Sequence, residues 1–267
     1  MNKTKSFLVA AGVSLALAFT LSCSSDDGGD NTGGNSNSSG GGGSSSSDGT
    51  NGGGQGHFNP DINYGSLTDP RDSKTYRTVI IGTQTWMAQN LNYDVPNNTT
   101  DACYNNEPGN CATYGRMYNW ATAMGLEQSC NSGTCANQEN HQGICPDNWH
   151  IPSDAEWEVL VKYVDPNWAS SNTNVAGTKL KAKSGWNAHE TFGNGTDDYG
   201  FSALPGGEVE AGSFKDVGEN AYWWSSTDNG NGLRVNLWRT YYNRSNVSSD
   251  GKDKTRLYSV RCLKNGN

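Results

Sequence analysis

One stretch of the chain, residues 145–158, reads CPDNWHIPSDAEWE and combines a cysteine, a turn and the start of a helix. Pro152 restricts Ile151 to an extended conformation. Ser153 suits the N-cap position, and Glu156 three residues later completes a capping box. The apolar residues that follow recur at helical spacing at Trp157, Leu160, Val161 and Val164. The stretch therefore predicts a tight turn followed by a capped helix.

The segments before and after this helix predict further elements. Residues 76–81 and 84–87 are typical of a β-hairpin with its turn at Gly82. Residues 177–186 predict one short helical turn. A first helix is predicted over residues 114–124, because Met117, Trp120, Ala121 and Met124 recur at helical spacing.

Three late segments, residues 221–226, 233–238 and 257–263, predict strands. The second and third alternate apolar and polar residues, as half-buried antiparallel strands do. The order of elements predicts an α+β fold with two helices and a mainly antiparallel sheet that joins strands near both termini.

The first 22 residues have the composition of an export signal, with two lysines before an uncharged run. The run is shorter than the roughly 20 apolar residues of a transmembrane anchor and is interrupted by polar residues. Its ending, FTLSC, resembles a bacterial lipobox, although Thr20 stands where the usual pattern has Leu. We expect a signal peptide (1–22) and lipidation of Cys23, with ordinary signal cleavage as the alternative.

The segment after Cys23 consists almost entirely of Gly, Ser, Asn and Asp. It has too few apolar side chains to offset the entropy of ordering, so we expect residues 23–58 to form the lipidated cysteine and a flexible tether. The acidic pair after Cys23 resembles signals that send some bacterial lipoproteins to the outer face. Residues 59–267 are then one domain, expected at the outer membrane or cell surface.

Six cysteines remain after Cys23, an even number that suggests three disulfides in an exported chain. Fifteen connectivities are possible for six cysteines. A zinc site at Cys130 and Cys135 is the alternative, but no second matching pair accompanies it. Spacing favours two local pairs and one long-range pair, namely Cys103–Cys111, Cys130–Cys135 and Cys145–Cys262.

The chain is acidic, with 27 Asp and Glu against 19 Lys and Arg. Nucleic acid and anionic membrane surfaces are poor partners for such a chain, which leaves neutral glycans and cations. The only membrane contact we expect is through the lipid anchor.

Several short motifs occur in a fixed order along the chain: TVIIG (78–82), QTWM (84–87), NLNY (90–93), YGRMYNW (114–120), WHIP (149–152), YGFSALPGG (199–207), YWWSST (222–227) and SVRC (259–262). Together they resemble the Fibrobacter succinogenes major paralogous domain family. The resemblance implies an exported or surface protein of bacteria, often a lipoprotein, without a characterised activity.

Residues 149–158 and 260–262 are also similar, more distantly, to the C-type-lectin-like fold of sulfatase-modifying enzymes. This similarity implies two helices, long disulfide-stapled loops and a sheet that joins both termini. It does not carry the activity, since fold alone does not imply function. Those enzymes use two cysteines late in the chain, whereas Cys262 is the only cysteine after Cys145.

No motif of a serine hydrolase, zinc peptidase or phosphate-binding loop is present. A polysaccharide hydrolase remains an alternative, because two carboxylates could face each other among Asp197, Asp198, Glu208, Glu210 and Glu219. Calcium is the one cofactor considered, with Asp197 and Asp198 as its candidate ligands in a glycine-rich loop. His150, between two apolar residues, is expected to be a core histidine.

Aromatic side chains with polar neighbours in the late strands predict a ligand-binding surface. Rings stack on sugar faces while polar groups orient hydroxyls. The alternative is that these rings are core, which we prefer for Trp120, Trp149, Trp157 and Trp223. The predicted ligand-binding residues are Trp224, Arg234, Asn236, Trp238, Tyr241 and Tyr242.

The sequence thus predicts a lipid-anchored, non-catalytic cell-surface module that binds carbohydrate or another extracellular ligand. The alternatives are a structural or adhesion protein that binds other surface proteins, and a hydrolase.

Overall fold

The structure is a computed structural model, and it describes residues 55–135, 141–168, 174–228 and 232–266. The predicted signal peptide, Cys23 and all but the last few residues of the predicted tether lie outside these described residues. The described residues belong to one unit, Gly49–Asn267. No helix among them is both long and apolar enough to cross a membrane.

The first sheet has five strands and joins segments from early and late in the chain. Its order is β1 (Gly65–Thr68), β2 (Thr75–Ile81), β3 (Gln84–Met87), β13 (Leu263–Lys264) and β6 (Trp149–His150). All neighbouring strands are antiparallel. The predicted hairpin is confirmed as β2 and β3, and so is the pairing of an early with a late strand.

The second sheet has six strands, in the order β11 (Val247–Asp253), β10 (Arg234–Tyr241), β9 (Asn220–Asp228), β12 (Tyr258–Ser259), β5 (Met117–Tyr118) and β4 (Asp101–Ala102). Only the pairing of β12 with β9 is parallel. The first two predicted late strands are confirmed by β9 and β10. A separate hairpin consists of β7 (Glu208–Glu210) and β8 (Ser213–Lys215).

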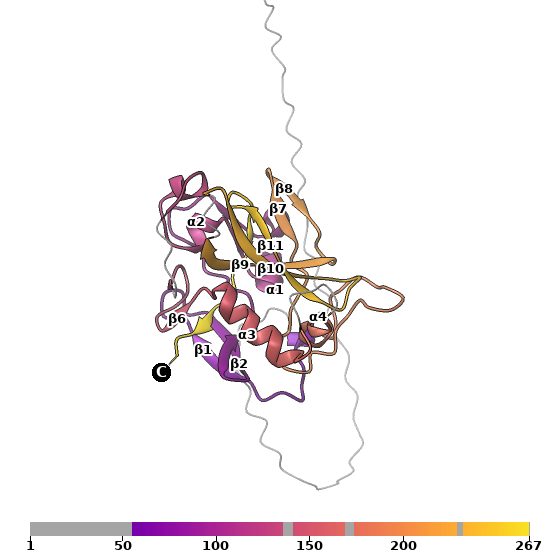
Figure 1. Ribbon diagram of the computed structural model, residues 1–267. Coiled ribbons are helices and arrows are strands. Elements are labelled where there is room, and N and C mark those ends of the chain that lie inside the picture. The colour runs from indigo at the N-terminus through magenta and orange to yellow at the C-terminus, as the bar shows by residue number, and fades with distance from the viewer. Residues whose placement is uncertain (1–54, 136–140, 169–173, 229–231, 267) are drawn as a thin grey trace, which may run out of the picture. The chain divides into compact units, whose positions relative to one another are not determined.

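Helix α3 (Asp154–Val164) is the predicted capped helix. The backbone N–H of Glu156 donates to Oγ of Ser153, and the backbone N–H of Ser153 donates to the Glu156 carboxylate, which confirms the capping box. The buried face of α3 shares one core cluster with Trp86 of the first sheet and with Trp223 and Trp238 of the second. The helix therefore connects the two sheets through aromatic side chains. In Figure 1, α3 runs between the labels of β1 and β2 of the first sheet and those of β9 and β10 of the second.

The continuous helix predicted over residues 114–124 is wrong. Helix α1 (Pro108–Tyr114) ends where the predicted helix begins, strand β5 follows, and α2 (Trp120–Ala123) is a single turn. The break lies at Gly115, whose φ is +78° and where a Cβ would lie 2.6 Å from Cβ of Asn90. The apolar residues at helical spacing are buried whether they lie in a strand (β5) or in a helical turn (α2). Their spacing alone therefore could not distinguish a continuous helix from a strand followed by a helical turn.

The other helical segments are short. Helix α4 (Ala176–Leu180) overlaps the short helical turn predicted over residues 177–186. Three 3-10 turns are η1 (Gln55–His57), η2 (Tyr104–Asn106) and η3 (Gln128–Asn131).

The strand predicted over residues 257–263 is divided between the two sheets. Strand β12 belongs to the second sheet and β13 to the first, and residues 260–262 cross between them. Backbone N–H groups of Leu91 and Met87 donate to the carbonyls of Val260 and Cys262, at 2.8 and 3.0 Å, and fix this crossing. The crossing carries Arg261 into the interior, where its side chain is 1% exposed.

The three predicted disulfides are confirmed, and the zinc alternative is wrong because its two sulfurs are joined to each other. The Cys145–Cys262 bond spans 117 residues and ties the stretch before α3 to the crossing between the sheets. The other bonds are Cys103–Cys111, which restrains α1, and Cys130–Cys135, which closes the loop at η3.

Candidate ligand-binding pocket

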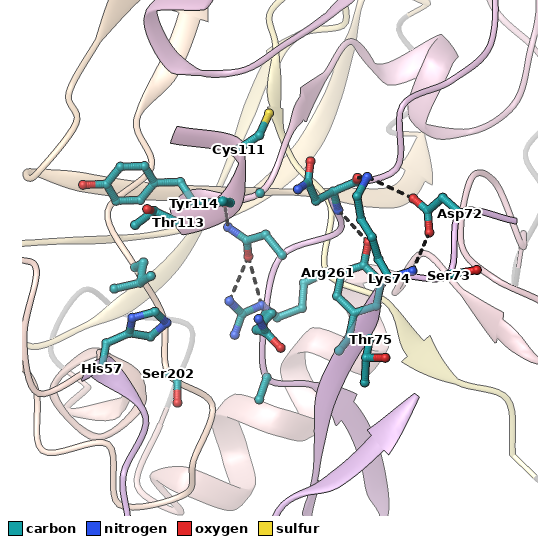
Figure 2. Close-up of a pocket in the computed structure, with 18 residues that line it drawn as sticks. His57, Asp72, Ser73, Lys74, Thr75, Cys111, Thr113, Tyr114, Ser202 and Arg261 are labelled. Carbon is teal, nitrogen blue, oxygen red and sulfur yellow. Dashed lines mark hydrogen bonds and ion pairs between the residues drawn. The ribbon is translucent and has the colours of Figure 1, made fainter. Parts of the chain in front are cut away.

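A cavity of about 450 Å³ lies where the start of β2, the segment after β3, helix α1 and the crossing between the sheets meet. In Figure 2 the guanidinium of Arg261 lies between His57 and Ser202 on one side and Lys74 on the other. Donors and acceptors therefore surround a central cation. The polar lining residues include His57, Ser73, Lys74, Gln89, Asn90, Asn92, Thr113, Tyr114, Ser202 and Arg261.

The guanidinium of Arg261 packs on the ring of Phe201, 4.3 Å from its centroid. Its Nε and Nη2 donate to Oδ1 of Asn90 at 3.0 and 2.8 Å, and Nη1 donates to the carbonyl of Phe201. None of the described carboxylates forms an ion pair with it. Burial lowers the pKa of Arg261 to about 9, despite the opposing influence of Asp197 and Tyr64.

Asn90 holds the guanidinium in place and is itself fixed at both ends of its amide. Oδ1 also accepts from the indole N–H of Trp223 at 2.9 Å, while Nδ2 donates to the carbonyl of Tyr114 at 2.8 Å. Tyr114 is the last residue of α1, so the amide joins the helix to strand β9. Gly115 is required here, because a side chain at that position would displace Asn90.

His57 forms another wall of the pocket and is 9% exposed. Burial, together with the charges of Arg261 and Arg77, lowers the pKa of His57 to about 4. The ring is therefore neutral at pH 7 and has one donor and one acceptor nitrogen. The sequence placed His57 in the tether, but its burial shows that the folded part of the chain begins before Asn59.

Lys74 is the second cation among the lining residues, and its charge is balanced locally. Its Nζ lies 3.0 Å from the carboxylate of Asp72 and also donates to the carbonyl of Asn92. Asp72 lines the pocket as well. The net positive charge of the lining at neutral pH is therefore that of Arg261 alone.

The residues predicted to bind ligand lie elsewhere, and none of the six lines this cavity. Trp224 and Trp238 are 0% and 1% exposed, and their indole N–H groups donate to the carbonyl of Tyr118 and to the carboxylate of Asp154. The prediction that these two rings face a ligand is corrected. Trp224 and Trp238 each belong to a buried hydrophobic cluster, so the two rings are core.

The other four predicted ligand residues are partly or fully exposed. Arg234 donates to the carbonyl of Gly251, and Asn236 donates to the carboxylate of Asp154. The guanidinium groups of Arg239 and Arg244 lie 5.2 and 5.1 Å from the centroid of the Tyr241 ring, and the ring of Tyr242 meets His189 edge to face at 5.9 Å.

The predicted calcium pair is divided between the interior and the surface. Asp197 is 0% exposed, and its carboxylate accepts from the backbone N–H and Oγ of Ser202 at 2.7 and 2.8 Å. Burial raises the pKa of Asp197 to about 6. Asp198 is exposed. No group of three or more potential His, Cys, Asp or Glu ligands occurs in the described parts of the chain, and Asp197 instead orders the loop at Ser202.

Two of the carboxylates considered for hydrolysis, Glu208 and Glu210, lie together on β7. Both form ion pairs with Arg256, and the hydroxyl of Tyr258 donates to Glu208 at 2.8 Å. Neither lines the cavity. They tie β7 to the segment before β12.

Sequence reasoning missed the residues that line the pocket, although several of them lie in the motifs that carry the family resemblance. Asn90, Tyr114, Ser202 and Arg261 come from four of these motifs. One signal pointed to Arg261: it is a charged residue between Val260 and Cys262, at a position where the predicted strand is otherwise core. A charged residue in such a place requires partners.

These features define a disulfide-bonded α+β domain with a polar pocket built around a buried arginine. Residues 79–264 match the Fibrobacter succinogenes major domain, and the protein belongs to that family. No curated protein and no solved structure matches the chain.

Proposed function

We propose that this protein is a non-catalytic binding module of the bacterial cell surface, and that its ligand is a carbohydrate held in the Arg261 pocket. The observation that carries the proposal is the pocket itself. Its volume of about 450 Å³ lies within the range of small-molecule sites. Its lining combines the rings of His57, Tyr76 and Tyr114 with amides and hydroxyls, as sugar recognition requires.

The location at the cell surface rests on the sequence. An export signal, Cys23 in a lipobox-like context and a Gly/Ser-rich segment precede the domain. On this proposal the lipid holds the protein at the outer membrane, and the domain reaches ligands outside the cell. We also propose a C-type-lectin-like arrangement for the domain, on the similarity of residues 149–158 and 260–262.

The lining favours binding over hydrolysis. A glycosidase needs two carboxylates, one on each side of the scissile bond. The lining holds one carboxylate, Asp72, and this group is paired with Lys74 at 3.0 Å.

Binding of plant-derived oligosaccharides to the purified full chain tests the proposal, with titration calorimetry as the readout. Thr113 is exposed on α1 and lines the cavity, so Thr113→Trp should block it. Thr83, exposed in the β2–β3 turn and outside the lining, gives the matched control Thr83→Trp. We expect wild type and the control to bind alike and the blocked variant to lose affinity at least about 10-fold, which is 1.4 kcal/mol. Absence of binding, or equal affinities for the two variants, would contradict the proposal.

A further inference from the structure

We infer that the pocket recognises a carboxylate, and that its ligand is an acidic sugar of the uronic acid type whose acid group binds Arg261. The inference rests on the proposed function and specifies the ligand class of the same site. Three features of the pocket support it. Within the described part of the chain, Arg261 has N–H groups without an acceptor, its positive charge has no contacting anion, and the other ionisable groups of the lining add no net charge.

The first feature is that some N–H groups of the Arg261 guanidinium have no hydrogen-bond acceptor in the described structure. A guanidinium has five N–H donors, and the bonds to Asn90 and Phe201 use three of them. One N–H on each Nη has no acceptor among the described residues. Two N–H groups on adjacent nitrogens match the two oxygens of a planar carboxylate, the pairing for which arginine is best suited.

The second feature is the charge of Arg261. A buried cation without a contacting anion is costly, and neutral acceptors offset only part of that cost. Asp197 raises the pKa of Arg261 through its charge but forms no ion pair with it among the described residues, and its carboxylate accepts hydrogen bonds from Ser202 instead. A ligand carboxylate would supply the missing counter-ion in an environment where the interaction is little screened.

The third feature is that the other ionisable groups of the lining add no net charge. The charges of Lys74 and Asp72 offset each other at 3.0 Å, and His57 is neutral at pH 7 because its pKa is lowered to about 4. The lining thus matches a ligand with a single negative charge. The side-chain amides of Gln89 and Asn92 are partly exposed and also line the pocket. They can form hydrogen bonds with the hydroxyl groups of such a ligand.

The first experiment changes the ligand and leaves the protein intact. Titration calorimetry at pH 7 compares galacturonic acid, which carries one carboxylate, with its methyl ester and with galactose on the wild-type full chain. The ester keeps the shape of the acid and removes its charge. Because a hydrogen bond to a charged group contributes roughly 1.5–3 kcal/mol, we expect the acid to bind about 10- to 100-fold more tightly than the ester.

The second experiment changes the arginine. In Arg261→Gln, the acid and the ester should bind with about equal affinity. The control Thr83→Trp should keep the same ratio of affinities as wild type. If Arg261→Gln does not fold, the comparison of acid with ester on wild type still decides the inference.

The outcomes separate this inference from the proposed function. Equal binding of acid, ester and neutral sugar, with all three lost in Thr113→Trp, overturns the carboxylate inference and leaves the binding function in place. Binding of none of the three overturns both.

Discussion

A single atom, Oδ1 of Asn90, accepts hydrogen bonds from two nitrogens of Arg261, at 3.0 and 2.8 Å. A neutral amide therefore occupies the position that a carboxylate would take in a buried ion pair. It orients the guanidinium and leaves its positive charge uncompensated. An aspartate at position 90 would neutralise the guanidinium and weaken the binding of an anionic ligand, whereas asparagine does not.

The amide of Asn90 should be among the most sensitive positions for stability. Asn90→Ala leaves the guanidinium, the Trp223 indole and the Tyr114 carbonyl without these partners. We expect the free energy of unfolding to fall by about 3 kcal/mol or more, measured by chemical denaturation. The control is Asn92→Ala, at a half-buried position of the same segment, with an expected change within about 0.5 kcal/mol. Equal losses in the two variants would contradict the assigned role.

Removing the N-cap of α3 should lower the free energy of unfolding by less than Asn90→Ala does. Ser153→Ala removes the Oγ acceptor of the Glu156 backbone N–H and should lower the free energy of unfolding by about 1 kcal/mol. Ser66→Ala, at an exposed position of β1, is the control and should be nearly neutral. Thermal and denaturant unfolding both measure this difference, and a neutral Ser153→Ala would show that the cap contributes nothing.

The His150–Glu156 pair predicts a dependence of stability on pH. Burial lowers the pKa of His150, but the hydrogen bond and charge of Glu156 outweigh it and leave the pKa above 6.5. Burial raises the pKa of Glu156, but His150 and Ser153 outweigh it and leave the pKa below 4.5. The pair's contribution is therefore complete between pH 4.5 and 6.5. It is lost above that window as His150 deprotonates and below it as Glu156 is protonated.

The variant that tests this pair is Glu156→Gln, which retains a capping side chain and removes the charge. The stability difference between wild type and this variant should be greatest inside the window and shrink on both sides, as denaturation at several pH values will show. Glu158→Gln, in the exposed pair with Lys162 on the same helix, should give a small difference without such a maximum.

The three disulfides should differ in their contribution to stability. In the chain-entropy model, a loop of 117 residues corresponds to about 5 kcal/mol. A loop of 5 residues corresponds to about 2 kcal/mol. We expect the Cys145→Ala/Cys262→Ala variant to lose clearly more stability than Cys130→Ala/Cys135→Ala in denaturant unfolding. Equal losses would show that the bond at the crossing does not act through the unfolded chain.

Local signals in the sequence were sufficient for parts of the fold. The capping residues Ser153 and Glu156, the hairpin turn at Gly82 and the spacing of the six domain cysteines each depend on near neighbours or on counting. Helix α1 and the break at Gly115 could not be found in this way, because that glycine is required by contact with Asn90, 25 residues earlier. Strand β11 (VSSDGKD) lacks apolar alternation and is held by pairing with β10.

The pocket was harder to predict than the fold. Aromatic residues in strands predicted a binding surface, but Trp224 and Trp238 are used for packing, which the sequence alone cannot separate from recognition. The groups that do line a cavity come from segments spread over most of the domain and meet only in three dimensions. Among them Arg261 was hidden inside a predicted strand, because the division of that strand between two sheets depends on tertiary pairing.

The crossing at residues 260–262 also determines when the protein can assume its structure during synthesis. Strands β12 and β13 fill interior positions of the two sheets, yet they come after all the other elements of the described residues. A ribosome-bound chain that lacks them has neither sheet complete, no Arg261 and an unpaired Cys145. Translation must therefore pass this segment before the domain can form, so release of a shortened chain would yield a protein without its pocket.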